Sequence, residues 1–216
     1  MGWREGESEI DHTGEQKKKL ELAEQFKNNN RYKLKESTEY VAGEGNYRYE
    51  TDSRGRIVKC SGTLELHDET SRNNYAQRKA GGENRHTKEN GEETADDGGH
   101  LIARRFGGSP EIDNIVAMDS GLNQHEYKTM ENDWASRLEE KTESGDSKYK
   151  VDVDIRCKYA DKNLETGERD SKRPTDIFVY SKVTDTETGE VVDRTIYHYK
   201  NEHEDNTTTR SLKKED

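Results

Sequence analysis

A glycine-rich stretch holds the densest group of chemically reactive side chains in this chain. It runs from position 96 to 108 and reads DDGGHLIARRFGG. Because glycine has no Cβ, Gly98 and Gly99 leave space around the next side chain, His100. An imidazole titrates near neutral pH and is therefore suited to remove a proton in a reaction. We expect His100 to lie on a tight turn and to act as a general base.

The segment from Leu122 to about Thr142 predicts a long helix, because its apolar residues recur at intervals of three or four. Asn123, Tyr127 and Glu131 are spaced four residues apart and so form a ridge beside the apolar stripe. Amide and carboxylate oxygens suit Mg²⁺, which takes few protein ligands and retains several waters. A general base and an oxygen-lined cation site together indicate metal-assisted phosphoryl transfer. The apolar stripe consists of Leu122, Met130, Trp134 and Leu138.

These residues resemble the signature of the DNA/RNA non-specific endonucleases, the His-Me finger nucleases with a ββα-metal site. The family pattern is an aspartate, two residues ending in glycine, a histidine, then an asparagine, a leucine-asparagine pair, an aromatic residue and a glutamate. The corresponding residues here are Asp97, Gly98, Gly99, His100, Asn114, Leu122, Asn123, Tyr127 and Glu131. The match covers roughly a fifth of the chain, and four chemically unlike positions at the family's intervals make it fairly specific.

The resemblance implies a role for each matched residue. His100 would be the general base, Asn123 the direct Mg²⁺ ligand, and Glu131 a partner of the waters around the ion. Asn114 would support that cluster, and Mn²⁺ is an expected substitute for Mg²⁺. The implied substrates are DNA, RNA or both, cleaved to leave a 5′-phosphate, and no small-molecule cofactor is expected.

Gly98 is a departure from the family, whose members commonly have arginine at this position. The Asp-Asp-Gly-Gly-His-Leu-Ile form is similar to nuclease domains at the C-termini of bacterial secreted toxins. The missing arginine leaves open which residue holds the phosphate. The candidates are Arg78, Arg85, Arg104 and Arg105.

Each of these residues also has a simpler interpretation when it is taken alone. A histidine after two glycines is often only a turn residue. Asn123 could cap a helix, and Glu131 could be a solvated charge on a helix face. Asp113-Asn114 also has the composition of an ordinary turn, and Arg104-Arg105 that of solvent-facing charges. Their combined spacing favours the catalytic interpretation.

Composition argues against a general nucleic-acid-binding surface. The 216 residues contain 36 basic and 47 acidic side chains, a net charge of −11, with 26% hydrophobic and 38% charged residues. Phosphate binding normally relies on a basic surface. The region from position 72 to 105 is nearly neutral, with seven basic residues against six acidic ones, so the positive charge is local. The 11 tyrosines supply burial that the aliphatic residues do not.

We expect an α+β fold in which an antiparallel sheet carries a ββα-metal unit and one long helix. Three parts are expected: a polar N-terminal segment with a short helix (1–30), a nuclease domain (31–200) and a disordered polar tail (201–216). The residue patterns predict the elements along the chain. These are a helix at 16–28, a hairpin built from 47–49 and 57–60 and extended to Leu66, a strand at 73–77, a polar loop at 81–93, a short helical piece after His100, a strand at 149–159, and a hairpin of 174–183 with 190–199.

The remaining expectations concern location and partners. No apolar run approaches the ~20 residues needed to span a bilayer, and the N-terminus lacks the apolar core of a signal peptide. We expect a secreted protein, or one delivered into target cells, whose delivery signal lies outside this sequence. Cys60 and Cys157 form either one disulfide or two buried thiols. A toxin would have a cognate immunity protein as a partner. The alternative function is a catalytically inactive, acidic protein-interaction module.

Overall fold

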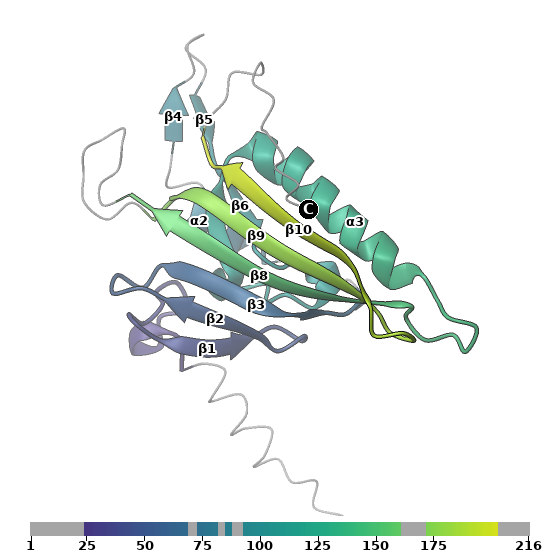
Figure 1. Ribbon diagram of the computed structural model, residues 1–216. Coiled ribbons are helices and arrows are strands. Elements are labelled where there is room, and N and C mark those ends of the chain that lie inside the picture. Colours follow the sequence, from purple (N-terminus) through teal and green to yellow (C-terminus); the bar gives the residue numbers. More distant parts are fainter. Residues whose placement is uncertain (1–23, 69–72, 82–84, 88–92, 161–171, 203–216) are drawn as a thin grey trace, which may run out of the picture.

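The computed structural model describes residues 24–68, 73–81, 85–87, 93–160 and 172–202, and it is built on a six-stranded antiparallel sheet. The strand order is β1-β2-β3-β8-β9-β10 (Figure 1). Alternate residues of these strands are buried, as expected for a sheet with one covered face. The α+β class and the antiparallel sheet are therefore confirmed. The strands are β1 (Glu39–Ala42), β2 (Tyr47–Thr51), β3 (Ile57–Leu64), β8 (Tyr149–Tyr159), β9 (Pro174–Asp185) and β10 (Val191–Lys200).

The sequence patterns located most of this sheet. β2 and β3 form the expected hairpin, whose turn contains Gly55 at φ +70°. β3 ends at Leu64, and Leu66 is exposed beyond it. β8 has the expected bounds, and β9 and β10 form the expected second hairpin. The alternation of apolar and polar residues, which is most regular in β8, therefore predicted these strands apart from the end of β3.

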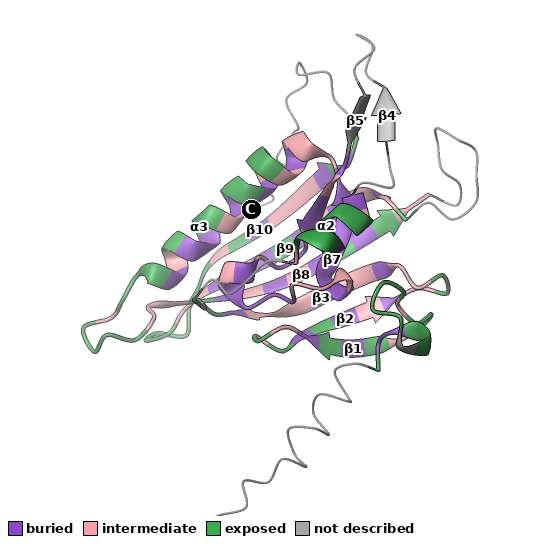
Figure 2. Cartoon of the chain, turned by 180° about the vertical axis from the view of Figure 1, so that it is seen from behind, coloured by how far each residue is buried: buried purple, intermediate pink, exposed green. Residues whose placement is uncertain are grey.

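The second layer covers one face of this sheet and contains the glycine-rich stretch (Figures 1 and 2). β6 (Asp97–His100) pairs with β7 (Ile115–Met118) in a small antiparallel sheet of its own. A π-helical turn, η4 (Leu122–Glu126), leads directly into α3 (Tyr127–Glu139), which packs on β8. Two short 3₁₀ turns, η2 (Arg104–Phe106) and η3 (Ile112–Asn114), lie between β6 and β7. The predicted order of two strands and a long helix is therefore present.

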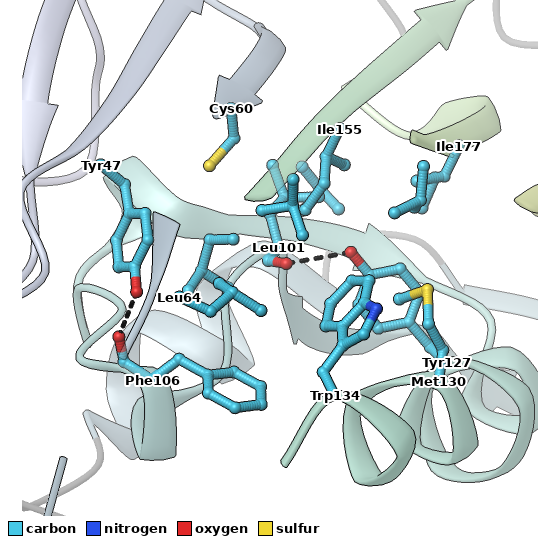
Figure 3. Close-up of a cluster of buried hydrophobic side chains, with 14 of the residues drawn as sticks. Tyr47, Cys60, Leu64, Leu101, Phe106, Tyr127, Met130, Trp134, Ile155 and Ile177 are labelled. Atoms are coloured by element: carbon cyan, nitrogen blue, oxygen red, sulfur yellow. Dashed lines mark hydrogen bonds between the residues drawn. The ribbon is translucent and has the colours of Figure 1, made fainter. Parts of the chain in front are cut away.

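The hydrophobic core lies between the two layers. Figure 3 shows Trp134 and Met130 of α3 together with Ile155 and Ile177 of the large sheet, and all four are buried. Buried tyrosines tie the layers together through hydroxyl groups: Tyr47 donates a hydrogen bond to the carbonyl oxygen of Phe106. Large aromatic side chains thus supply the burial that the low aliphatic content could not.

Two expectations about local structure were wrong, and a third is tested only at its described end. Residues 73–77 are not a strand, because α2 (Asn74–Gly81) is a helix. The side chain of Asn73 accepts hydrogen bonds from the backbone N–H groups of Tyr75 and Ala76, which is how an N-cap starts a helix. The loop expected at 81–93 contains β4 (Arg85–Thr87), which pairs with β5 (Glu93–Ala95). The helix expected at 16–28 lies mostly outside the described residues, and its described end is a bridge at Phe26 followed by η1 (Lys27–Asn29).

Asn201, the first residue of the expected tail, belongs to the fold. Its buried side chain donates to the carbonyl oxygens of Ala117 and Pro174 and accepts from the backbone N–H of Asp119. It therefore connects the end of β10 to β7. Residues 203–216 lie outside the described part of the chain.

The two cysteines are free and buried, in the neighbouring strands β3 and β8. Burial raises the pKa of the Cys157 thiol to about 12 and also raises the pKa of Cys60. Both are therefore neutral, unreactive thiols near neutral pH. Among the described residues, no helix is both long enough and apolar enough to cross a membrane.

An ion pair between Arg173 and Asp96 connects the layer that contains β6 to the large sheet. Arg173, just before β9, donates to both carboxylate oxygens of Asp96, at 2.7 and 3.1 Å, and the Asp96 carboxylate is fully buried. Asp96 directly precedes β6, so this contact positions the start of the glycine-rich stretch.

Removing the side chain of Arg173 should destabilise the fold, because it leaves the buried carboxylate of Asp96 unpaired. We expect Arg173→Ala to lower the free energy of unfolding by about 3 kcal/mol. Urea denaturation followed by tryptophan fluorescence measures this loss. Arg194→Ala, on the exposed part of β10, is the control and should change stability by less than about 0.5 kcal/mol. Equal stability of the two variants would contradict a role for the Arg173–Asp96 pair.

Candidate active site

His100 is the last residue of β6 and faces helix α2. Its backbone pairs with Ile115 of β7, and its ring is half-buried. The side-chain nitrogen Nε2 of Gln77 in α2 lies 3.5 Å from Nδ1 of His100. The next residues, Leu101 and Ile102, are buried and anchor the strand end. The imidazole is therefore held at the boundary between a rigid strand and a helix.

The close packing of α2 explains the glycine at position 98. A Cβ on Gly98 would lie 2.3 Å from the backbone oxygen of Gln77 and 2.5 Å from its Cα. Any larger side chain would push α2 away from β6. The arginine that the family commonly has at this position would therefore not fit this packing, and α2 brings Gln77 to His100 instead.

Asn123 lies against the other face of β6. Its amide nitrogen donates to Oδ2 of Asp97 at 3.0 Å, and Gln124 donates to the same oxygen at 2.9 Å. A carboxylate only accepts hydrogen bonds, so Asp97 fixes the NH₂ group of Asn123 and leaves its oxygen for another partner. That oxygen faces Gly99, where a Cβ would lie 3.0 Å from it. The second glycine thus makes room for the amide oxygen.

The π-helical turn sets the position of Asn123 on its helix. The N–H of Tyr127 bonds to the carbonyl oxygen of Leu122, five residues earlier, and such wide turns occur frequently at functional sites. Asp119 caps the start, because its carboxylate accepts from the N–H of Leu122. Asn123 is therefore not the capping residue, and its side chain is directed to Asp97 instead.

Glu131 is half-buried on α3, one turn beyond Tyr127. The hydroxyl of Tyr127 donates to the carbonyl oxygen of Leu101, directly after His100 (Figure 3). Burial raises the pKa of Tyr127 well above its usual range, and the negative charge of Glu131 raises it further. Tyr127 therefore stays protonated and ties α3 to the end of β6, with the Glu131 carboxylate close by.

Asn114 is completely buried and supports the turn after His100. Its oxygen accepts from the hydroxyl of Tyr49 and the N–H of Ile102, and its nitrogen donates to the carbonyl oxygens of Ile102 and Ser109. These four bonds use the whole hydrogen-bonding capacity of the amide. Asn114 therefore acts on the site through the backbone, and no group remains to contact water around an ion.

The four candidate arginines lie in different environments. Arg104 is buried, donates to the carbonyl oxygen of Gly108 and pairs with Glu44, so it is part of the scaffold. Arg105 is half-buried, with its guanidinium 5.1 Å from the centre of the Phe106 ring. The side chain of Arg85 lies outside the described residues. Arg78 is exposed on α2, directly after Gln77.

Sequence reasoning missed the roles of Asp97, Gln77 and Gln124. Asp97 matched the family signature, but no local pattern indicates that its partner is an amide 26 residues later. Gln77 lies in a segment expected to be a strand, so its approach to His100 could not be inferred. Among the described residues, no group of three or more histidine, cysteine, aspartate or glutamate side chains could hold a metal ion. A site formed by one amide oxygen and water is compatible with that result.

A family model described as "DNA/RNA non-specific endonuclease" matches residues 36–184, which is more than half of the chain. The chain belongs to the DNA/RNA non-specific endonuclease family. The matched range begins before β1 and ends one residue before the end of β9, and it therefore includes every candidate residue of the site. The resemblance based on the histidine motif is thus confirmed at the level of the family.

Curated relatives of this endonuclease family member include the type VII secretion system protein EssD of Staphylococcus aureus, from strains USA300 and NCTC 8325 / PS 47. Each is 39% identical over 140 residues, covering 62% of this chain and 21% of the relative. The chain therefore spans about a fifth of the length of these relatives. Two solved structures are also similar.

The first of the two solved structures is an "extracellular nuclease" with 16% identity; the match covers 75% of this chain and 88% of that chain, with a TM-score of 0.43. The second is an "extracellular endonuclease" with 15% identity; the match covers 79% of this chain and 86% of that chain, with a TM-score of 0.46. Both TM-scores lie below 0.5, so family membership is assigned without them.

Proposed function

We propose that this protein is a Mg²⁺-dependent endonuclease that hydrolyses phosphodiester bonds of DNA, RNA or both. The observation that carries the proposal is the fixed amide of Asn123, which Asp97 holds against the strand that ends in His100. Family membership supports the same activity.

The residues present fit a hard divalent cation. The Asn123 amide uses its nitrogen to donate to Asp97, so its oxygen, which faces Gly99, is the atom that would bind the ion. Asn123 would hold the ion, and Glu131 would accept hydrogen bonds from water at the site. When bound, Mg²⁺, or Mn²⁺ in its place, supplies positive charge that stabilises the phosphate as its charge develops in the transition state.

His100 would remove the proton from the water that attacks phosphorus, with Nδ1 as the expected acceptor; the water would replace the long contact of the Gln77 amide nitrogen with Nδ1. Arg78, exposed on the same helix as Gln77, would hold a phosphate oxygen. The family resemblance implies a 5′-phosphate on the product. Side chains alternate along β6, so His100 projects from one face of the strand while Asn123, from the turn η4, lies against the other face. The two side chains would reach the substrate at the end of the strand.

Digestion of plasmid DNA and of structured RNA, with Mg²⁺ and with excess EDTA, tests this function. We expect cleavage of at least one substrate with Mg²⁺ and none with EDTA. A folded protein that cuts neither substrate with Mg²⁺ or Mn²⁺ would contradict the proposal and favour an inactive interaction module.

We also propose that this domain is secreted as a toxin. The support is its similarity to EssD, which is named as a protein of a type VII secretion system. A producing cell then needs an immunity protein that binds the nuclease domain, and its surface should be partly basic because this chain carries a charge of −11. Co-expression with the neighbouring gene products of the producer, followed by pull-down, tests for that partner.

Asp97→Asn should weaken metal binding while leaving the fold intact. An amide can donate as well as accept, so it no longer fixes which end of the Asn123 amide faces the ion. We expect the Mg²⁺ concentration for half-maximal cleavage to rise about 10–100-fold, as is typical when a partner of a metal ligand is lost. A metal titration of the initial cleavage rate measures this shift, and an unchanged half-maximal concentration would contradict the positioning role.

A further inference from the structure

Two exposed tyrosines lie together at helix α2, which also carries Gln77 of the candidate active site. Tyr75 of α2 is 52% exposed and Tyr32 is 36% exposed. Their ring centroids are 5.0 Å apart, in an edge-to-face arrangement with an interplanar angle of 61°. In such a pair, one ring presents only its edge to the other, so its faces are left for a third planar group. Among the described residues, this is the one ring pair in which both members are exposed.

We propose that Tyr32 and Tyr75 form a stacking surface for an unpaired base of single-stranded nucleic acid. This inference rests on the proposed nuclease function and adds a substrate class to it. Tyr75 lies two residues before Gln77, which contacts His100, so the two positions are about 3 Å apart along the axis of α2 but point to different sides of it. A strand whose phosphate is at His100 would therefore reach the tyrosine pair by crossing α2, the helix that carries both positions.

Positive charge accompanies the aromatic pair. Arg78 is three residues after Tyr75 and so shares its face of the helix, and both are exposed. Arg31 directly precedes Tyr32; its side chain is 68% exposed, and its contact with Glu111 is long, at 3.4 Å. An exposed ion pair of this kind is weak, so the guanidinium of Arg31 is available to a phosphate. Aromatic rings interleaved with basic groups are typical of surfaces that bind single strands.

The chemistry of stacking selects unpaired bases without selecting a sequence. Every base has a π face, so an aromatic surface tolerates all four bases. In a duplex those faces are already covered by neighbouring bases and are not accessible to a side chain. The tyrosine pair should therefore favour single-stranded DNA or RNA, or the unpaired loops of RNA, over intact duplex.

Binding can be measured apart from cleavage in a His100→Ala background with EDTA present. The probes are a fluorescein-labelled 12-nucleotide poly(dT), the corresponding poly(U), and a 12-base-pair DNA duplex, followed by anisotropy at low salt. We expect the single strands to bind more tightly than the duplex, and Tyr75→Ala to weaken single-strand binding about tenfold. Tyr75→Phe keeps the ring and should retain binding. Tyr32→Ala should weaken binding in the same direction.

Tyr180→Ala is the matched control, because Tyr180 is 38% exposed but lies on β9 of the large sheet, where Arg156 covers its ring. It should leave binding unchanged. Single-strand binding that is equal in Tyr75→Ala and Tyr180→Ala would overturn the stacking surface, as would an equal loss of single-strand and duplex binding in Tyr75→Ala. In either case, cleavage by the wild-type protein would leave the proposed nuclease function standing. If the wild-type protein neither binds nor cuts any probe, both proposals are wrong.

Discussion

His100→Ala is expected to lower the rate of phosphodiester cleavage about 10²–10⁴-fold, the usual contribution of a positioned general base. Alanine cannot accept a proton from water, and the strand that carries it should remain in place because Leu101 and Ile102 are buried beside it. Initial rates on plasmid DNA and RNA at saturating Mg²⁺ measure the loss. Thermal melting should show an intact fold.

His198→Ala provides the comparison, since this histidine lies on β10 of the large sheet, paired with Asp176 and stacked on Phe178. Its cleavage rate should match that of the wild-type protein. A His100→Ala protein that cuts as fast as the His198→Ala protein would eliminate the proton-transfer role of residue 100.

Asn123→Ala is expected to have the second large effect, a loss of Mg²⁺-supported activity of about 100-fold or more. The substitution removes the amide oxygen that faces Gly99, and with it the proposed ligand. The measurements are the cleavage rate at rising Mg²⁺ concentration and, independently, Mg²⁺ binding by calorimetry.

Gln124→Ala separates the loss of a ligand from the loss of a hydrogen bond. Gln124 is exposed and donates to the same oxygen of Asp97, but its own oxygen has no proposed role. We expect a much smaller shift in the Mg²⁺ requirement for this variant. Equal shifts in Asn123→Ala and Gln124→Ala would mean that Asn123 acts only by holding Asp97.

The sequence predicted the elements whose pattern reflects burial on one side. β8 matched its alternating residues from Tyr149 to Tyr159, and the two hairpins followed from alternation and turn residues. The long helix expected from Leu122 is also present, as the turn η4 followed by α3, which ends at Glu139. In these segments the local pattern and the tertiary environment impose the same structure.

The errors occurred where a single side-chain contact, and not the pattern of apolar residues, decides the outcome. The helix α2 is short, and its start depends on one capping side chain, Asn73, which the apolar pattern does not reveal. Arg104 is of a residue type that usually faces solvent, and Asn114 was expected to face the site. Both are buried and form hydrogen bonds within the scaffold instead. The Asp97–Asn123 contact joins residues far apart in the chain, and only the fold brings them together.

Anomalous diffraction from a crystal soaked in Mn²⁺ tests most directly whether an ion and His100 share one site. We predict a single strong peak within coordination distance of the Asn123 side-chain oxygen, about 2.0–2.2 Å. Nδ1 of His100 should be close enough for one phosphate group to contact both. A peak elsewhere in the chain, or an imidazole separated from the ion by more than one phosphate can bridge, would contradict the account.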